Sequence, residues 1–296
     1  MWTNAARELP GQGWMKARRW AAWFLLFLAN GLLVFIVFSH YYPLLGGTAD
    51  GIGRVIIAAG FLGAAVIAWR SERLMKYWPI PFAFFTGLTA ISIDYYFSVS
   101  RWIIPALGVQ ARSPEGWAIE KLESSLLGIL VVLTLTRLSG QRLESLYLRR
   151  GNLRLGLIVG LAAFSIMFVT TIPVAEMYFK GQNLSWARLL PWTPWLFIFV
   201  LANASNEELI FRGLFLGKAE PFLGRFGANL VTAITFTLMH SFVNYATNTM
   251  IFLTLQTLPA ALVWGWLMQK TNSIWGSILF HAAMDIPIIV GIFSTL

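Results

Sequence analysis

Apolar stretches close to the length of a membrane-spanning helix recur from one end of the chain to the other. A hydrocarbon layer about 30 Å thick needs roughly 20 apolar residues in helical form. Polar and glycine- or proline-containing segments separate these stretches, so we predict about nine spanning helices, within a range of eight to ten. The predicted spans are residues 20–38, 55–69, 80–99, 119–135, 155–172, 194–211, 227–241, 250–268 and 274–293.

Helices are the expected spanning element because backbone polar groups that face lipid must be hydrogen-bonded within their own segment. We therefore predict an all-α, polytopic transmembrane helical bundle. The first apolar stretch follows Lys16, Arg18 and Arg19 and could be mistaken for a signal peptide. It is long for a signal peptide and has no clear small-x-small cleavage site, so we interpret it as a span.

Composition supports this class, since 57% of the residues are hydrophobic and only 12% are charged. The loops are short, and we find no internal repeat, low-complexity segment or soluble domain. The chain contains no cysteine, which excludes a thiol nucleophile, disulfides and thiolate metal sites.

The net charge of +9 raises the question of nucleic-acid binding, but the distribution of the charges argues against it. With the N-terminus in the cytoplasm, most Lys and Arg residues fall on the cytoplasmic side, as the positive-inside rule predicts. We therefore expect a multi-pass protein of the cytoplasmic (inner) membrane, in contact with the lipid bilayer and with no nucleic-acid partner. The main basic clusters are Lys16/Arg18/Arg19, Arg70/Arg73/Lys76 and Arg137/Arg142/Arg149/Arg150/Arg154.

Two adjacent glutamates, Glu207 and Glu208, interrupt the sixth apolar stretch. Carboxylates are costly in hydrocarbon, so their presence in a span indicates a functional site. Glu208 and Arg212 are four residues apart, with the acid first, which favours an ion pair on one helix face. Glu207 points about 100° away from Glu208. We predict that Arg212 holds Glu208 and that Glu207 is free to take part in chemistry.

Other polar residues in the last third of the chain lie in apolar stretches. His240 is near the end of the seventh span, and His281 and Asp285 share one face of the ninth. A single buried histidine fits a structural role, but a Glu, two His and an Asp from three helices together resemble a site that activates water. A Glu can act as general base, and a neutral His can donate to a developing oxyanion. The third histidine, His40, is expected to be an interfacial polar residue at a membrane boundary.

Three motifs follow one another along this part of the chain: Glu207-Glu208-x-x-x-Arg212, Phe236-x-x-x-His240 and His281-x-x-x-Asp285. Their order and spacing resemble those of the CPBP (Abi) family, which contains the type II CAAX prenyl proteases and bacterial intramembrane endopeptidases. The resemblance covers roughly residues 194–296. We therefore expect a CPBP-like catalytic core at 191–296 and an N-terminal transmembrane region of about five spans, without motif support, at 1–190.

The resemblance implies an intramembrane glutamic-type endopeptidase that uses no metal or other cofactor. Glu207 and His240 would activate water, and His281 and Asp285 would stabilise the oxyanion. The substrate would be a membrane-anchored peptide or protein, cleaved near its anchor. The resemblance does not assign the cleavage motif, a prenyl pocket or the oligomeric state.

The resemblance also assigns Glu208 and Arg212 as structural support of the site, the division of the two glutamates that helical geometry indicates. One position departs from the family, because the well-studied prenyl proteases have Asn where this chain has Asp285. An Asn amide donates a hydrogen bond to an oxyanion, whereas an ionised Asp cannot. Either Asp285 is protonated, or it orients His281.

Three other hydrolytic mechanisms have less support in the sequence. Two His and a carboxylate form a common zinc ligand set, but no His-Glu-x-x-His motif occurs and Arg212 disfavours a dication. Ser277 and His281 are four residues apart, yet no Gly-x-Ser-x-Gly elbow exists and a small residue fits helix packing. Asp94 and Asp285 are the candidates for an aspartyl pair, and Asp94 is better interpreted as an interhelical hydrogen-bonding group.

Two interpretations need no catalysis. A non-catalytic family member, such as a bacteriocin-immunity or scaffold protein, would keep the same fold. A transporter would also place ionisable residues in spans. The confinement of these residues to the last third and the lack of paired broken helices in two halves argue against transport. The complete set of expected ionisable positions argues against a degenerate site.

Overall fold

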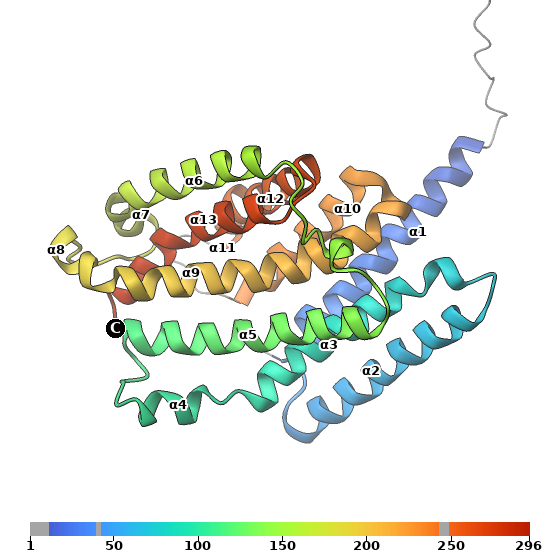
Figure 1. Cartoon of the computed structure of the whole chain (residues 1–296), viewed down its shortest axis with the longest axis horizontal. Coiled ribbons are helices and arrows are strands. Elements are labelled where there is room, and N and C mark those ends of the chain that lie inside the picture. Colours follow the sequence, from blue (N-terminus) through green and yellow to red (C-terminus); the bar gives the residue numbers. More distant parts are fainter. Residues whose placement is uncertain (1–11, 40–42, 243–248) are drawn as a thin grey trace, which may run out of the picture.

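Helices make up all the regular secondary structure of the computed structural model, which describes residues 12–39, 43–242 and 249–296 (Figure 1). Within these ranges no strand occurs, and several helices are long and apolar enough to cross a membrane. The prediction of an all-α, polytopic helical bundle is therefore confirmed. His40 lies outside the described residues.

The longer helices form the body of the bundle. They are α1 (Gln12–Leu32), α2 (Gly47–Arg70), α3 (Pro79–Phe97), α5 (Pro114–Leu138), α6 (Leu153–Val169), α9 (Thr193–Glu208), α10 (Gly217–Met239), α12 (Leu258–Thr271) and α13 (Trp275–Phe293). The shorter helices are α4 (Ser100–Ala106), α7 (Thr171–Tyr178), α8 (Trp186–Leu189) and α11 (Thr249–Phe252). Three π-helical segments extend them: η1 (Leu33–Val37), η5 (Leu209–Leu216) and η7 (Leu253–Thr257). The 3₁₀ turns are η2 (Met75–Tyr77), η3 (Leu143–Leu146), η4 (Leu190–Trp192) and η6 (His240–Phe242).

Each predicted span coincides with helix, but fewer helices meet a strict test of length and hydropathy. Among the residues that the structure describes, six pass it, or seven if α6 and α7, which meet at a 70° bend, form one broken span. The difference has two sources. The N-terminal half of α5 carries several charged residues, and the sixth and seventh predicted spans belong to one helical run, Trp186–Met239. That run breaks at Gly224, whose φ of 70° and ψ of 173° are not helical.

Local signals in the sequence explain several helix boundaries. Ser113 precedes Pro114 at the start of α5, and its hydroxyl accepts a hydrogen bond from the Gly116 amide at 3.1 Å. Asn152 caps α6 in the same way. Asn272 ends α12 in the left-handed conformation, which asparagine tolerates better than most residues. These caps satisfy backbone groups that a helix end would otherwise leave without partners.

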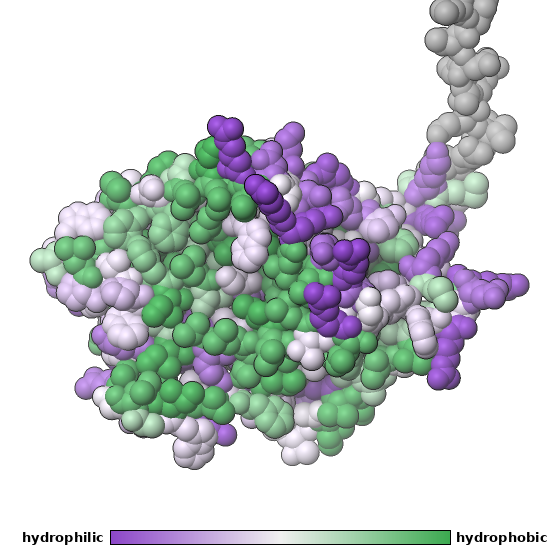
Figure 2. All heavy atoms as spheres, viewed as in Figure 1, coloured by the Kyte–Doolittle hydropathy of each residue, from purple (hydrophilic) through white to green (hydrophobic). Residues whose placement is uncertain are grey.

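Helix α13 lies at the centre of the bundle, where it packs against α6, α9 and α12, and α5 packs beside α9 (Figure 1). Of the apolar stretch of α13, 72% is buried inside the protein, against 17% for α2. Figure 2 shows apolar side chains over the middle of one face. Hydrophilic side chains gather toward the start of α1, the α2–α3 connection and the α5–α6 connection. The basic clusters thus lie toward one end of the bundle, and the side of the membrane that this end faces stays a prediction.

The contact between α6 and α13 depends on two glycines at their crossing. A Cβ atom on Gly276 would lie 2.6 Å from the Cα atom of Gly156 and 2.9 Å from its carbonyl oxygen. Backbone atoms cannot move aside as a flexible side chain can, so this crossing requires small residues. The close approach of α6 fixes one side of α13, the helix that carries His281 and Asp285.

We expect Gly276→Ala to lower stability by about 1–3 kcal/mol, because the added methyl forces the two backbones apart. Thermal denaturation of the purified protein in detergent measures the change. The matched control is Gly63→Ala on α2, where nothing lies within 4 Å of the new atom. Equal denaturation temperatures for the two variants would contradict the proposed role of the crossing.

Candidate active site

The two adjacent glutamates lie where α9 passes into the π-helical segment η5. Glu208 Oε1 lies 3.0 Å from Arg212 Nη1, and neither side chain has exposed surface. Glu207 remains partly exposed, at 14% of its side-chain surface. The structure therefore separates the two carboxylates as the helical spacing indicates, one in a dry ion pair and one at a cavity.

Arg212 is held on all sides by protein atoms. Its Nη2 donates a hydrogen bond to the carbonyl oxygen of Ala261 on α12 at 3.0 Å. Its guanidinium group lies 4.7 Å from the ring centroid of Phe236 and 5.3 Å from that of Trp264. Contact with the faces of aromatic rings stabilises a cation that has been removed from water. Arg212 thus links η5, α10 and α12.

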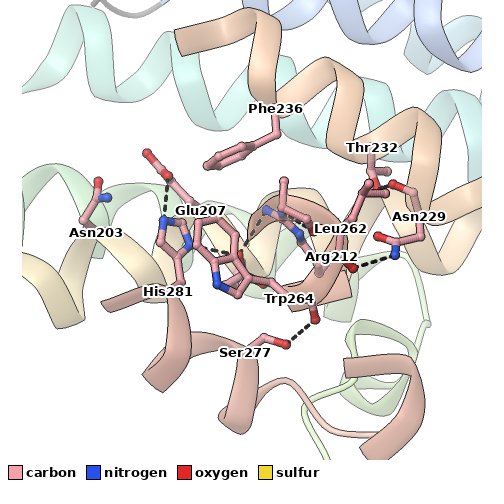
Figure 3. A network of polar contacts seen from close by, with 12 residues as sticks. Asn203, Glu207, Arg212, Asn229, Thr232, Phe236, Leu262, Trp264, Ser277 and His281 are labelled. Atoms are coloured by element: carbon pink, nitrogen blue, oxygen red, sulfur yellow. Dashed lines mark hydrogen bonds and ion pairs between the residues drawn. The ribbon is translucent and has the colours of Figure 1, made fainter. Parts of the chain in front are cut away.

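His281 on α13 is surrounded by three carboxylates, and Figure 3 shows its contact with Glu207. Its Nδ1 is 2.9 Å from Glu208 Oε1, and its Nε2 is 3.5 Å from Glu207 Oε2 and 3.7 Å from Asp285 Oδ1. Trp264 stacks on the imidazole, with 3.9 Å between ring centroids and 9° between planes. The ring is therefore fixed in orientation, with Nδ1 on the dry ion pair and Nε2 toward the other two carboxylates.

Asp285 has a partner that the sequence analysis missed. The side-chain amide of Asn203 on α9 donates from Nδ2 to Asp285 Oδ2 at 3.0 Å. Asn203 precedes Glu207 by four residues, so both project from one face of the helix. A polar residue one turn before the glutamates, in an otherwise apolar stretch, was the available signal. The structure thus places the side-chain amide of Asn203 beside Asp285, the position at which the well-studied prenyl proteases have Asn.

His240 directly follows α10 as its C-cap residue, and its ring is held by that helix. Its Nδ1 lies 2.8 Å from the carbonyl oxygen of Phe236, one turn earlier. A carbonyl can only accept, so Nδ1 carries a proton, and in the neutral ring Nε2 is an acceptor. The ring of Phe236 packs against His240 at 4.5 Å between centroids and against His281 at 5.6 Å. One phenylalanine thus separates and positions both histidines.

A cavity of about 330 Å³ joins these side chains. Glu207, His240, His281 and Asp285 all line it, as does Asn203. Most of the remaining wall is apolar or aromatic. It includes residues of α5 as well as of the last third of the chain: Trp117, Lys121, Phe199, Phe252, Met284, Ile288 and Ile292. The four residues predicted to be catalytic therefore border one chamber, although they come from three helices.

Ser277 and Asp94, the candidates for a serine and an aspartyl mechanism, form hydrogen bonds that fit structural roles. Ser277 is fully buried, and its hydroxyl donates to the carbonyl oxygen of Trp264 at 2.7 Å. Asp94 accepts a hydrogen bond from Ser124 on α5 at 2.7 Å, the interhelical role expected for it. Across the described ranges, no three His, Asp or Glu side chains form a ligand set for a metal ion. A metal would also have to compete with Arg212 and His281 for Glu208.

Comparison with known families supports the resemblance seen in the sequence. Residues 189–287 match the family model described as "Type II CAAX prenyl endopeptidase Rce1-like". The matched segment contains every predicted site residue, and it begins within a few residues of the expected catalytic core. No curated protein and no solved structure matches the chain.

We expect Glu208→Ala to destabilise the protein by about 3–5 kcal/mol, because it leaves the buried Arg212 guanidinium without its carboxylate. Thermal denaturation and the yield of folded protein from membranes measure the loss. Glu207→Gln is the matched control, since it alters the neighbouring carboxylate without breaking the dry pair. Similar denaturation temperatures for the two variants would contradict the division of roles.

Proposed function

We propose that this chain, whose residues 189–287 belong to the type II CAAX prenyl endopeptidase Rce1-like family, is an intramembrane glutamic-type endopeptidase. It would hydrolyse a peptide bond of a membrane-anchored peptide or protein near the anchor. The observation that carries the proposal is the convergence of Glu207, His240, His281 and Asp285 on one chamber inside an apolar bundle. Hydrolysis within a membrane needs such a polar cavity, because hydrocarbon contains almost no water.

Glu207 is the proposed general base. Its Oε2 is buried and has no hydrogen-bond partner among the described residues, whereas Glu208 is bound to Arg212 and His281. His281 Nε2 lies 3.5 Å from this oxygen, beyond an ordinary hydrogen bond, so the oxygen can still accept a hydrogen bond from water. Glu207 would take a proton from this water as the oxygen attacks the carbonyl carbon of the substrate.

His240 is the proposed second partner of the water. Because its Nδ1 donates to the Phe236 carbonyl, the neutral ring presents Nε2 as an acceptor. Two acceptors, Glu207 and His240, would then orient both hydrogens of the water and direct an oxygen lone pair toward the substrate. The proton collected by Glu207 passes to the nitrogen of the leaving amine, and the carbon–nitrogen bond breaks.

The oxyanion would be stabilised by donors on the other side of the chamber. His281 donates from Nδ1 to Glu208, so the proposed role requires the doubly protonated, cationic ring, whose Nε2 proton would point toward Glu207 and Asp285. Asn203 offers an amide at the same place, ordered by its bond to Asp285. Fixed donors of this kind stabilise a developing oxyanion more than water does. We therefore assign Asp285, in this proposal, the orienting role toward His281 and Asn203.

The walls of the chamber suggest the substrate class. Long apolar side chains such as Ile288, Ile292 and Met284 line the chamber beside the polar site. An apolar lining accommodates a lipid chain or a hydrophobic helix next to the bond to be cleaved. The description of the matched family makes a prenylated, membrane-anchored peptide the first substrate to test.

The first test is cleavage of membrane-anchored reporter peptides, with and without a prenyl group, by the purified protein in bilayers. We expect Glu207→Gln to lower kcat by roughly 10²–10⁴-fold, the usual contribution of a general base, while folding is preserved. Addition of a chelator should leave wild-type cleavage unchanged.

Loss of activity with chelator and recovery with zinc would instead support a zinc-dependent intramembrane protease. Retention of cleavage by Glu207→Gln would contradict the glutamic mechanism. If no reporter is cleaved by the wild type, the non-catalytic interpretation gains support.

A second test separates Asn203 from Asp285. We expect Asn203→Ala to lower kcat by roughly 10²-fold with little change in KM, because it removes a donor used in the transition state. Asp285→Asn keeps an acceptor oxygen for Asn203 and should stay within about tenfold of wild type. Steady-state kinetics on one reporter peptide measures both. Wild-type kcat in Asn203→Ala would exclude its role as a donor.

A further inference from the structure

A second, smaller cavity of about 60 Å³ lies beside the active-site chamber. Its walls come mainly from α3, α5 and α9, and just over half of its lining residues lie in the N-terminal half of the chain. Half of the residues that line it have polar side chains. They are Ser39, Asp94, Lys121, Ser124, Asn203, Asn206 and Glu207.

Glu207 forms part of the boundary between the two cavities. It lines both of them, together with Lys121, Asn203 and Met239. The large chamber opens from Glu207 toward α12 and α13, and the small cavity opens from it toward α3 and α5. The proposed general base therefore borders two spaces, the large chamber with the other predicted site residues and the small cavity toward α3 and α5.

Two residues that line the small cavity have a buried side-chain oxygen without a hydrogen bond among the described residues, Asn206 at Oδ1 and Glu207 at Oε2. His281 Nε2 lies 3.5 Å from Glu207 Oε2. An unpartnered buried polar atom costs about 1–3 kcal/mol, so such atoms are normally satisfied by ordered water. A cavity of about 60 Å³ with several polar partners has room for more than one water molecule.

The walls of this cavity are shaped around its polar groups. A Cβ atom at Gly128 on α5 would lie 2.5 Å from Asn206 Oδ1, so glycine leaves the space that the amide occupies. One turn earlier on the same helix, the Ser124 hydroxyl donates to Asp94 Oδ2 on α3 at 2.7 Å. This bond fixes the Asp94 carboxylate at the cavity, on the side of the site formed by α3.

We propose that the small cavity is a water site that supplies Glu207, and that Asp94 and Ser124 are positioning residues that order its water. This inference rests on the proposed function, in which Glu207 activates a water molecule. A substrate and its apolar anchor would fill the large chamber and displace water from it. A separate polar cavity behind the general base keeps a water within reach while the substrate is bound.

The first experiment uses the absence of cysteine from the chain. Ser124→Cys places a thiol in the proposed water site, and Ser125→Cys places one on the neighbouring residue, which is 1% exposed and lines neither cavity. Methyl methanethiosulfonate reacts with thiolates, and a thiol ionises in contact with water but resists ionisation in apolar packing. We expect modification of Ser124→Cys and at least about tenfold slower modification of Ser125→Cys. Equal, slow modification of both variants would overturn the water site.

The second experiment measures kcat and KM separately. Ser124→Ala and Asp94→Asn should lower kcat by roughly 10- to 100-fold, the scale of a misplaced reactant, and leave KM nearly unchanged. Ser124→Thr keeps the hydroxyl and should recover most of the loss. Ser125→Ala is the matched control and should retain wild-type kcat. A wild-type kcat in both Ser124→Ala and Asp94→Asn would overturn the positioning role.

A third variant fills the cavity without removing a polar group. Ala90 lines the small cavity, and Ala83 on the same helix α3 does not, although both are 1% exposed. Ala90→Val should lower kcat more than Ala83→Val at equal thermal stability. An equal kcat in the two variants would count against a water supply through this space.

The outcomes separate this inference from the proposed function. Thiol modification is also measured in the Glu207→Gln background, where no cleavage is required. If Ser124→Cys is modified but cleavage does not require Glu207, the water site is supported and the glutamic mechanism is contradicted. If cleavage requires Glu207 but Ser124→Cys is unreactive and Ser124→Ala keeps wild-type kcat, only the water site is contradicted.

Discussion

The buried ion pair between Glu208 and Arg212 is the interaction on which the rest of the candidate site depends. Both side chains are fully buried, and each is also bound to another helix. Arg212 binds the Ala261 carbonyl on α12, and Glu208 binds His281 on α13. Removal of one partner from a buried pair leaves an unpaired charge, which costs far more than the pair itself contributes. The positions of three helices are therefore coupled to one pair of charges.

The exclusion of water from this ion pair distinguishes Glu208 from Glu207, the identical residue before it in the sequence. Phe236 and Trp264 cover the Arg212 guanidinium and also contact the His281 ring. They exclude water from the Glu208 side of the site, whereas Glu207, one residue away, borders both cavities. A polar centre inside a bilayer needs this arrangement, because water must be available at one carboxylate without access to the structural ion pair.

The candidate site is not built from the last third of the chain alone. Helix α5 packs beside α9 and contributes Trp117 and Lys121 to the large chamber. Asp94 on α3 and Ser124 on α5 line the smaller cavity. The family match ends at residue 287 and begins at 189, so it leaves these helices unassigned. Their contacts with the site give the N-terminal spans a physical reason to be present, beyond covering the core.

The sequence by itself determined the features that follow from local geometry. Apolar stretches of spanning length predict helices, and the four-residue spacing predicts that Glu208 meets Arg212 and that His281 and Asp285 share a face. Contacts between distant segments could not be predicted in this way. The bonds from His281 to Glu208 and from Asn203 to Asp285 join residues 73 and 82 positions apart. Only the tertiary structure decided them, because they depend on how whole helices pack, and packing sums many weak contacts that no local pattern of residues encodes.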